Sequence, residues 1–383
     1  MEAPKILITG ATGYIGGSLL THLLTTSPPS LKTATYTVLL RTASQTSLFA
    51  ALPVTTHVLS TPDSLAELRA LASNFDVIVN PAYATDPGAS RALTLGLGDR
   101  LKEREREDSG SGKSAQGAVV PHIIQTSGTS NLSDRPHSNP TLFADLGLAL
   151  ETETDATSTR SFTDAPHDQA RILHTMRKLE AKEEYPQRSA TLAVLDTAKQ
   201  VGVRATVLMS PTIFGPGTGP GKTASIQIPM LVRAVRRSGV ARVVGQGGEQ
   251  WDAIGIRDLV GVYEGVLGRV VSGEGEAVGG DVLFTTTTRF SWRELVGRVV
   301  DAGTSLGYLK AEEGKRVEVK GVELKEFTKW LGLEGMEGFV ELGFASNART
   351  SGEVARGWGW KGEDGLEDGI ERDWKMIADA EGW

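Results

Sequence analysis

Three glycines near the start of the chain are spaced so that they could hold a phosphate group: Gly10, Gly13 and Gly16 form the pattern G-x-x-G-x-x-G. The apolar run before them, residues 5–10, predicts a buried strand, and residues 14–24 predict a helix. Glycine lets the backbone approach a pyrophosphate, and a helix N-terminus offers unpaired N–H groups. The pattern therefore predicts a dinucleotide-binding turn rather than a plain tight turn. Three neighbouring residues complete the predicted contact set: Thr12, Tyr14 and Ile15.

The second predicted strand, residues 35–41, ends at Arg41, with Thr42 and Ser44 beside it and no carboxylate nearby. In a dinucleotide-binding sheet this position meets the adenosine ribose, where an acidic residue would bind both ribose hydroxyls. A guanidinium instead suits a 2′-phosphate. Arg41 therefore favours NADP(H), with NAD(H) as the alternative cofactor and an exposed arginine at a strand end as the structural alternative.

The elements that position these residues alternate along the first half of the chain, which is typical of an α/β domain with a parallel sheet. The predicted strands are residues 5–10, 35–41, 56–60, 76–82, 119–128 and 204–215. The predicted helices of this half are residues 14–24, 63–74, 168–182 and 186–200. Beyond about residue 217, loops rich in glycine and proline separate predicted helices at 226–238, 257–272 and 291–303.

The predicted fold is a Rossmann-type, doubly wound parallel sheet over residues 1–215. Residues 216–383 mostly form a smaller C-terminal substrate-binding lobe, from which some segments can return to the sheet. Two polar stretches interrupt the pattern. Residues 98–117 predict a helix end followed by a mobile insertion, and residues 131–168 predict an extended surface excursion.

Composition excludes several classes of protein. The 383 residues suffice for one large or two modest domains, and the formal net charge of −7 argues against nucleic acid or an anionic membrane as partner. Without cysteine there is no disulfide or thiolate chemistry, and His167 with His174 lacks a third ligand for a metal. No leader peptide and no apolar run of about 20 residues is present, which predicts a cytoplasmic protein.

Five segments in order support a family resemblance: TGATGYIGG (9–17), DVIVNPAY (76–83), IIQTSGTS (123–130), VRATVLMSPTIFGPG (203–217) and FASNARTSGEVARGWGWK (344–361). With them the sequence resembles the extended or atypical short-chain dehydrogenase/reductases, the NAD-dependent epimerase/dehydratase-like superfamily, and most closely a fungal-type subgroup. The resemblance implies a small-molecule substrate and a homodimer as one oligomeric state.

The resemblance also implies roles for particular positions. Ser127 or Thr129 would be the catalytic hydroxyl, with Ser127 also beside the cofactor. The other implied cofactor contacts are Pro81, Ala82 and Tyr83 near the nicotinamide ribose, and Pro211, Thr212 and Ile213 along the nicotinamide. The implied substrate contacts are Phe214, Lys222, Gln227 and Trp251, with residues 215–223 as a mobile loop at the substrate mouth.

The catalytic unit of this family, Tyr-x-x-x-Lys, is missing, because none of the six tyrosines has lysine four positions later. Tyr185 lies at about the right place and is followed by Arg188. The two could form a modified acid/base pair in which Arg188 lowers the pKa of the tyrosine. Alternatively, Tyr185 simply packs at a helix start and Arg188 lies on the surface.

Together these features predict an NADP(H)-dependent oxidoreductase that reduces or oxidises a small-to-medium carbonyl or alcohol in secondary metabolism. One alternative is a non-redox epimerase, dehydratase, isomerase or cyclase on the same scaffold. Another is a cofactor-sensing regulator, similar to the NmrA-like proteins, that binds the dinucleotide without turnover.

Overall fold

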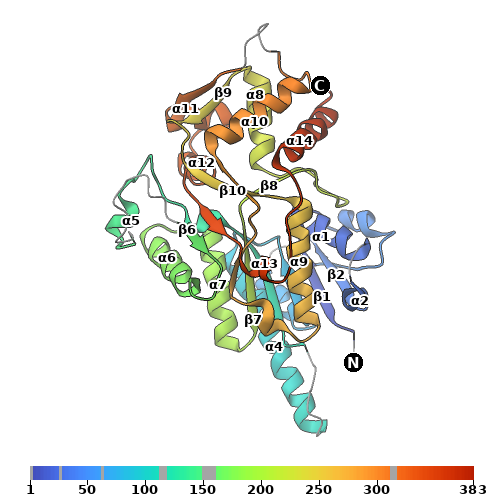
Figure 1. Cartoon of the computed structure of the whole chain (residues 1–383). Coiled ribbons are helices and arrows are strands. Elements are labelled where there is room, and N and C mark those ends of the chain that lie inside the picture. Colours follow the sequence, from blue (N-terminus) through green and yellow to red (C-terminus); the bar gives the residue numbers. More distant parts are fainter. Residues whose placement is uncertain (1–2, 26–27, 62–63, 112–118, 149–160, 311–316) are drawn as a thin grey trace.

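A seven-stranded parallel sheet forms the centre of the molecule, in the order β11-β7-β5-β4-β1-β2-β3 (Figure 1). The computed structural model describes residues 3–25, 28–61, 64–111, 119–148, 161–310 and 317–383. The strands are β1 (Lys5–Thr9), β2 (Thr35–Leu40), β3 (Thr55–Val58), β4 (Val77–Asn80), β5 (His122–Gly128), β7 (Arg204–Ser210) and β11 (Val282–Phe284). Strand order reverses beside β1, which opens a crevice at the carboxyl ends of β1 and β4. The predicted doubly wound α/β fold is therefore confirmed.

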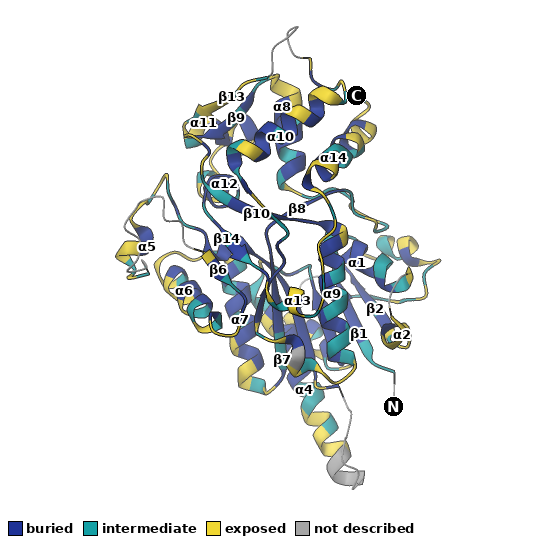
Figure 2. Cartoon of the chain, in the orientation of Figure 1, coloured by how far each residue is buried: buried dark blue, intermediate teal, exposed yellow. Residues whose placement is uncertain are grey.

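Helices cover both faces of this sheet and bury its strands (Figure 2), and apolar side chains of the strands lie on both faces. One face carries α1 (Tyr14–Thr25), α2 (Pro29–Lys32) and α9 (Ile256–Val271). The other face carries α3 (Leu65–Ala72), α4 (Pro87–Ser111) and α7 (Pro186–Val201). Helix α9 and strand β11 come from the C-terminal half of the chain, which therefore contributes to the sheet body as well as to the upper lobe.

The upper lobe in Figure 1 has a core of its own, built around tilted and edge-on aromatic rings. Its strands are β8 (Thr212–Phe214), β10 (Gln250–Gly255) and β12 (Thr288–Ser291) in one sheet, and β9 (Ala241–Val244) and β13 (Val319–Val322) in another. Its helices are α8 (Gln227–Ser238), α10 (Trp292–Ser305), α11 (Leu324–Leu331), α12 (Glu337–Phe344) and α14 (Leu366–Glu381). Trp292 lies at the centre, with its ring centroid 5.4 Å from those of Trp251 and Phe290.

The helix end expected within residues 98–117 is present, because residues 98–111 form the last part of helix α4. Arg100 and Arg104 lie one turn apart and both bind Asp76, with the Arg104 Nη2 to Asp76 Oδ1 distance at 2.6 Å. These ion pairs hold the charged part of the helix against the sheet end. Residues 112–118, where the rest of the expected insertion falls, lie outside the described residues.

In the described parts of the expected surface excursion, residues 131–148 and 161–168, residues 131–133 and 162–165 are buried or half-buried, whereas most of residues 136–148 are exposed or half-buried. Glu341 of α12 accepts hydrogen bonds from the backbone N–H groups of His137 and Ser138, at 2.8 and 2.9 Å. Strand β6 (Ser161–Thr163) pairs with β14 (Arg349–Ser351). Asp164 is buried, and its carboxylate accepts from the backbone N–H of Glu353, 189 residues further along the chain, a partner that composition cannot reveal.

Short elements complete the described chain: η1 (Ala43–Phe49), η2 (Thr129–Leu132), α5 (Leu142–Asp145), α6 (Gln169–Lys182), η3 (Gly275–Val278) and α13 (Val354–Gly357). Within the described ranges, no helix has the length and apolar character that a membrane-spanning segment requires.

Candidate functional site

A cavity of about 630 Å³ lies between the carboxyl ends of the sheet strands and the upper lobe. It runs from the turn after β1 to helix α12. Thirteen of the predicted cofactor residues line it: Gly10, Thr12, Gly13, Tyr14, Ile15, Gly16, Arg41, Pro81, Ala82, Tyr83, Ser127, Pro211 and Ile213. Of the predicted catalytic and substrate residues, Tyr185, Lys222, Gln227 and Trp251 line it as well.

The turn after β1 has the geometry of a phosphate cradle. Gly10 has φ +64°, a left-handed conformation that favours glycine, and a Cβ there would lie 3.1 Å from the backbone nitrogen of Ala82. A Cβ at Gly16 would collide with the carbonyl oxygen of Gly10. The turn leads directly into the N-terminus of α1, whose first N–H groups lack intrahelical partners. These residues fit the diphosphate of a dinucleotide.

Residues 215–223, which we call the glycine strap, lie across this turn instead of forming the expected mobile loop. Three alternate glycines make the close approach possible. A Cβ at Gly219 would lie 2.5 Å from Gly17 Cα, and a Cβ at Gly221 would collide with the carbonyl oxygen of Thr12. The backbone N–H of Lys222 donates to that same oxygen at 2.9 Å. The strap is therefore packed backbone to backbone on the cofactor turn, and Lys222 lines the cavity beside it.

Tyr14 fastens the strap to α1. Its ring lines the cavity, and its hydroxyl donates to the carbonyl oxygen of Gly215 at 2.6 Å. Burial raises the pKa of Tyr14, and the nearby carboxylates of Asp373 and Asp364 raise it further. The hydroxyl is therefore a permanent donor to the strap.

Arg41 lies at the far end of the cavity, where β2 ends. The backbone N–H groups of Arg41 and Thr42 donate to Gln45 Oε1, at 3.1 and 3.3 Å, which holds the turn in place. The guanidinium itself is exposed, and no residue in the described part of the chain forms an ion pair or hydrogen bond with it. It is therefore available to an anionic group on a ligand.

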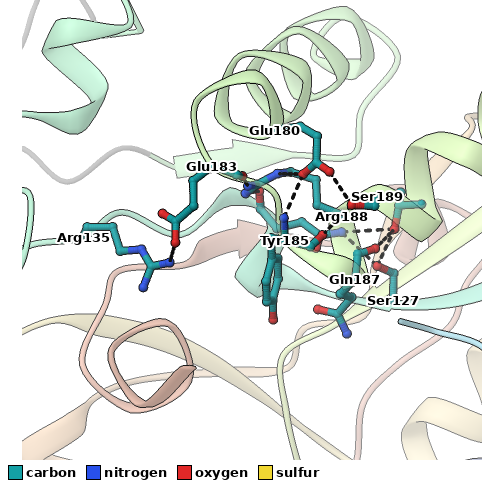
Figure 3. Close-up of polar contacts among 10 residues, drawn as sticks. Ser127, Arg135, Glu180, Glu183, Tyr185, Gln187, Arg188 and Ser189 are labelled. Atoms are coloured by element: carbon teal, nitrogen blue, oxygen red, sulfur yellow. Dashed lines mark hydrogen bonds and ion pairs between the residues drawn. The ribbon is translucent and has the colours of Figure 1, made fainter. Parts of the chain in front are cut away.

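Tyr185 meets a serine that the sequence interpretation missed. The Tyr185 hydroxyl lies 3.1 Å from Ser130 Oγ, and Ser130 Oγ donates to Gln187 Oε1 at 2.7 Å. All three residues line the cavity, and Figure 3 shows Tyr185 and Gln187 pointing the same way from the start of α7. The segment IIQTSGTS contains four hydroxyl residues, and the sequence did not distinguish Ser130 from the others. No sequence pattern pointed to Gln187 as a site residue. Its side-chain amide occupies the space that the missing side chain of Gly128 leaves open.

The two predicted catalytic hydroxyls serve other roles. Ser127 lines the cavity, but its Oγ lies 2.7 Å from Thr191 Oγ1 and accepts from Asn131 Nδ2 at 2.9 Å. Thr129 is fully buried away from the cavity, because η2 turns its side chain inward and presents Ser130 instead. The prediction of Thr129 as a catalytic residue is therefore wrong.

Two more predicted contacts are buried away from the cavity lining, Thr212 and Phe214, both with 0% exposure. The Phe214 ring packs against Gly369 of α14, where no side chain would fit. Because strand residues alternate between two faces, Ile213 faces the cavity and its two neighbours do not. Thr212 is thus no cofactor contact and Phe214 no substrate contact.

Arg188 supports Tyr185 from behind rather than lining the cavity. Its Nε donates to Glu180 Oε2 at 2.9 Å and its Nη2 donates to the carbonyl oxygen of Glu183 at 2.7 Å, as Figure 3 shows. Burial raises the pKa of Tyr185, outweighing the lowering by the Ser130 hydrogen bond and by Arg188. Arg188 therefore lowers the pKa of Tyr185 as expected, but burial outweighs this effect, so the net pKa is raised and Tyr185 stays protonated at neutral pH.

The opposite end of the cavity has few polar atoms to offer. Trp251 Nε1 donates to Ser346 Oγ at 3.2 Å, and Gln227 Nε2 donates to the carbonyl oxygen of Gly343 at 2.5 Å. Ile226 and Phe339 complete this wall. The side-chain N–H donors of Trp251 and Gln227 therefore bind other residues of the protein.

Asp373 of α14 binds the first residue of the glycine strap, and its carboxyl should make the stability of the protein depend on pH. Its Oδ2 accepts from the backbone N–H of Gly215 at 3.0 Å, and burial raises the pKa of Asp373 to about 7. The pKa of Asp373 is higher in the folded state than in the unfolded state. The protonated carboxyl therefore adds to the free energy of unfolding at acid pH, and this stabilisation is lost as pH rises through about 7. We expect Asp373→Asn to unfold at least about 2 °C above wild type at about pH 8, with a smaller difference at about pH 5.

Thermal unfolding monitored by circular dichroism at both pH values measures this difference. Asp368→Asn, an exposed change on the same helix, is the matched control and should show the same small difference at both. If Asp373→Asn unfolds at the same temperature as wild type at both pH values, ionisation of the Asp373 carboxyl does not destabilise the protein.

The fold is similar to that of the extended short-chain dehydrogenase/reductases, with a cavity above the glycine turn. Residues 157–278, about a third of the chain, match the model of the NAD dependent epimerase/dehydratase family. The chain is 26% identical over 373 residues to the oxidase ucsJ of Acremonium sp, covering 93% of this chain and 92% of that protein. These findings confirm the family resemblance.

Solved structures share the fold at low sequence identity. PbgP3 protein from Burkholderia pseudomallei is 13% identical, with a TM-score of 0.58 over 99% of this chain and 98% of its own. dTDP-glucose 4,6-dehydratase from Bacillus anthracis in complex with NAD is 15% identical, with a TM-score of 0.56 over 100% and 98%. UDP-glucuronic acid 4-epimerase from Bacillus cereus in complex with UDP-glucuronic acid and NAD is 12% identical, with a TM-score of 0.54 over 98% and 99%.

Proposed function

We propose that this protein is an NADP(H)-dependent oxidoreductase that interconverts a small-to-medium carbonyl and its alcohol in secondary metabolism. One observation carries the proposal: a single cavity joins the glycine turn to the cluster of Ser130, Tyr185 and Gln187. A cofactor seated on the turn and a substrate oxygen at the cluster would share that space. The likeness to an oxidase over 93% of the chain supports a redox reaction.

The residues of the cluster can position and protonate a substrate oxygen. Because Ser130 donates its proton to Gln187 Oε1, Tyr185 is the donor in its contact with Ser130 and can turn this proton toward a substrate oxygen. A bound reduced nicotinamide would supply the hydride. In the described lining, no Asp, Glu or His offers an alternative proton donor.

Arg41 should decide the choice of cofactor. We expect wild type to bind NADPH at least about tenfold more tightly than NADH, because a guanidinium pairs with the 2′-phosphate. Arg41→Asp should lose that preference, since its carboxylate repels the phosphate. Titration with each nucleotide, followed by reduced-nicotinamide fluorescence, measures both affinities.

The matched control is Arg91→Asp, the same charge change at an exposed residue of α4 outside the cavity lining. It should leave both affinities within about twofold of wild type. Equal binding of NADH and NADPH by wild type would overturn the assignment of NADP(H) and leave NAD(H) as the cofactor.

A non-redox epimerase, dehydratase, isomerase or cyclase is the second candidate, favoured by the fold shared with a dehydratase and an epimerase. A cofactor sensor without turnover is the third, favoured by the absence of a lysine four positions after Tyr185. Net oxidation of NADPH with a carbonyl supports the proposal. A sensor would instead bind oxidised and reduced cofactor with clearly different affinities and turn over no carbonyl.

A further inference from the structure

The charges along the cavity are confined to its cofactor side. Arg41 and Lys222 are the charged residues among those described in the lining, and no carboxylate faces them there. Arg41 lies at the end of β2. Lys222 lies on the glycine strap, with its backbone N–H bound to Thr12 of the cofactor turn. The backbone of both residues therefore lies in the half that would hold the dinucleotide.

The other half of the cavity has a largely apolar wall, which we call the carbon wall, although Ser225 and Gln227 also line it. Trp251, Phe339 and Phe344 contribute aromatic rings, and Ile226 contributes an aliphatic chain. Ile226 is 65% exposed and Phe339 is 42% exposed, although both are large apolar side chains. Exposed apolar residues at a cavity rim mark a surface that an apolar ligand can cover.

The nearest cation behind this wall is already engaged. Arg135 is 7% exposed, and its Nη1 donates to the carbonyl oxygen of Gly338 at 2.6 Å. Its Nη2 donates to Glu183 Oε1 at 2.5 Å, and Glu341 Oε2 lies 3.8 Å from Nη1. With two carboxylates against it, Arg135 has no charge to offer to a diphosphate.

Two hydrogen-bond donors, on Gln187 and Tyr185, lie beside the carbon wall. Gln187 Oε1 accepts from Ser130, whereas no described residue accepts a hydrogen bond from its amide nitrogen. The Tyr185 hydroxyl lies on the other side of Ser130. Two donors, the Gln187 amide and the Tyr185 hydroxyl, can therefore point at one acceptor atom of a ligand.

We propose that the substrate is an uncharged, largely apolar ketone or aldehyde, whose oxygen accepts hydrogen bonds from Tyr185 and Gln187 and whose carbon skeleton covers Trp251, Phe339 and Ile226. This excludes nucleotide sugars, and it rests on the proposed redox function. The hydride of the reduced cofactor bonds to the carbonyl carbon, and the C=O π pair moves to oxygen, which takes the Tyr185 proton. The carbonyl is reduced, the nicotinamide is oxidised, and water returns a proton to Tyr185.

The test uses prodan, an uncharged aromatic ketone whose emission shifts to the blue in apolar sites, with the full chain saturated with NADP⁺. We expect saturable binding that UDP-glucuronic acid does not displace. Phe339→Glu and Ile226→Glu should each weaken prodan binding at least about tenfold, because each places a carboxylate on the carbon wall. Both residues are exposed, so the fold should tolerate the changes.

The matched control is Met336→Glu, an exposed apolar residue beside α12 that lies outside the lining. It should keep prodan affinity within about twofold of wild type. Displacement of prodan by UDP-glucuronic acid, or unchanged prodan binding in both wall variants, would overturn the proposed substrate class.

Cofactor titration of the same proteins separates the two proposals. If NADPH binds normally and UDP-glucuronic acid displaces prodan, the substrate class fails and the redox function stands. If prodan behaves as expected and neither NADPH nor NADH binds, the redox function fails, whereas the uncharged, apolar character of the ligand stands.

Discussion

Replacing Gly16 by alanine is expected to weaken dinucleotide binding roughly 100-fold, about 2.7 kcal/mol. The new Cβ would collide with the carbonyl oxygen of Gly10, which is backbone and cannot swing aside. The turn must therefore open, and one or two hydrogen bonds to the cofactor phosphates are lost, each worth about 1.5–3 kcal/mol. The fluorescence titration with NADPH measures the change.

The matched control is Gly268→Ala, because Gly268 is also a helical glycine but has open space where its Cβ would be added. Alanine is the better helix former, so this control should bind NADPH as wild type does and gain roughly 0.5–1 kcal/mol of stability. A Gly16→Ala variant with wild-type affinity would show that the cofactor phosphates do not rest on this turn.

Tyr185→Phe is expected to lower carbonyl turnover by roughly 100-fold or more, the usual contribution of a positioned proton donor. NADPH affinity should stay within about twofold of wild type, because the tyrosine lies beyond the glycine turn in the cavity. The assay follows NADPH consumption with the most active member of a panel of uncharged ketones and aldehydes.

Tyr36→Phe is the matched control for this change. Tyr36 is buried far along the sheet, and its hydroxyl donates to the carbonyl oxygen of Leu31 at 2.8 Å. Its removal should cost about 1 kcal/mol of stability and leave turnover unchanged. Ser130→Ala should fall between the two variants in turnover. Full turnover in Tyr185→Phe would refute the assignment of this tyrosine as the proton donor.

Predictions from local sequence succeeded where a short segment contains its own physical reason. The turn at 10–16 combines glycine spacing, a preceding apolar strand and a following helix within one short stretch. The helix predicted at 186–200 begins at Pro186, which suits a first helical position, and ends at Gly202, whose φ is +76°. Alternating elements were enough for the sheet class, because parallel strands need helical crossovers.

Predictions were incomplete where the outcome depends on a distant partner. At residues 98–111 the sequence indicated a helix end, but not that Arg100 and Arg104 bind Asp76. For the stretch after β5 the sequence indicated a surface excursion, but not that Glu341 binds the backbone of His137 and Ser138. In both cases the deciding group lies far away in sequence.

For the site, the sequence by itself determined the cofactor cradle and Tyr185 as the candidate hydroxyl beside it. Only the tertiary structure decided that Ser130, rather than Ser127 or Thr129, meets that hydroxyl, and that Gln187 stands beside them. It also decided that the glycine strap is packed on the turn. The physical reason is that the cradle is built from local backbone conformation, whereas the catalytic cluster and the carbon wall arise where segments distant in sequence pack together.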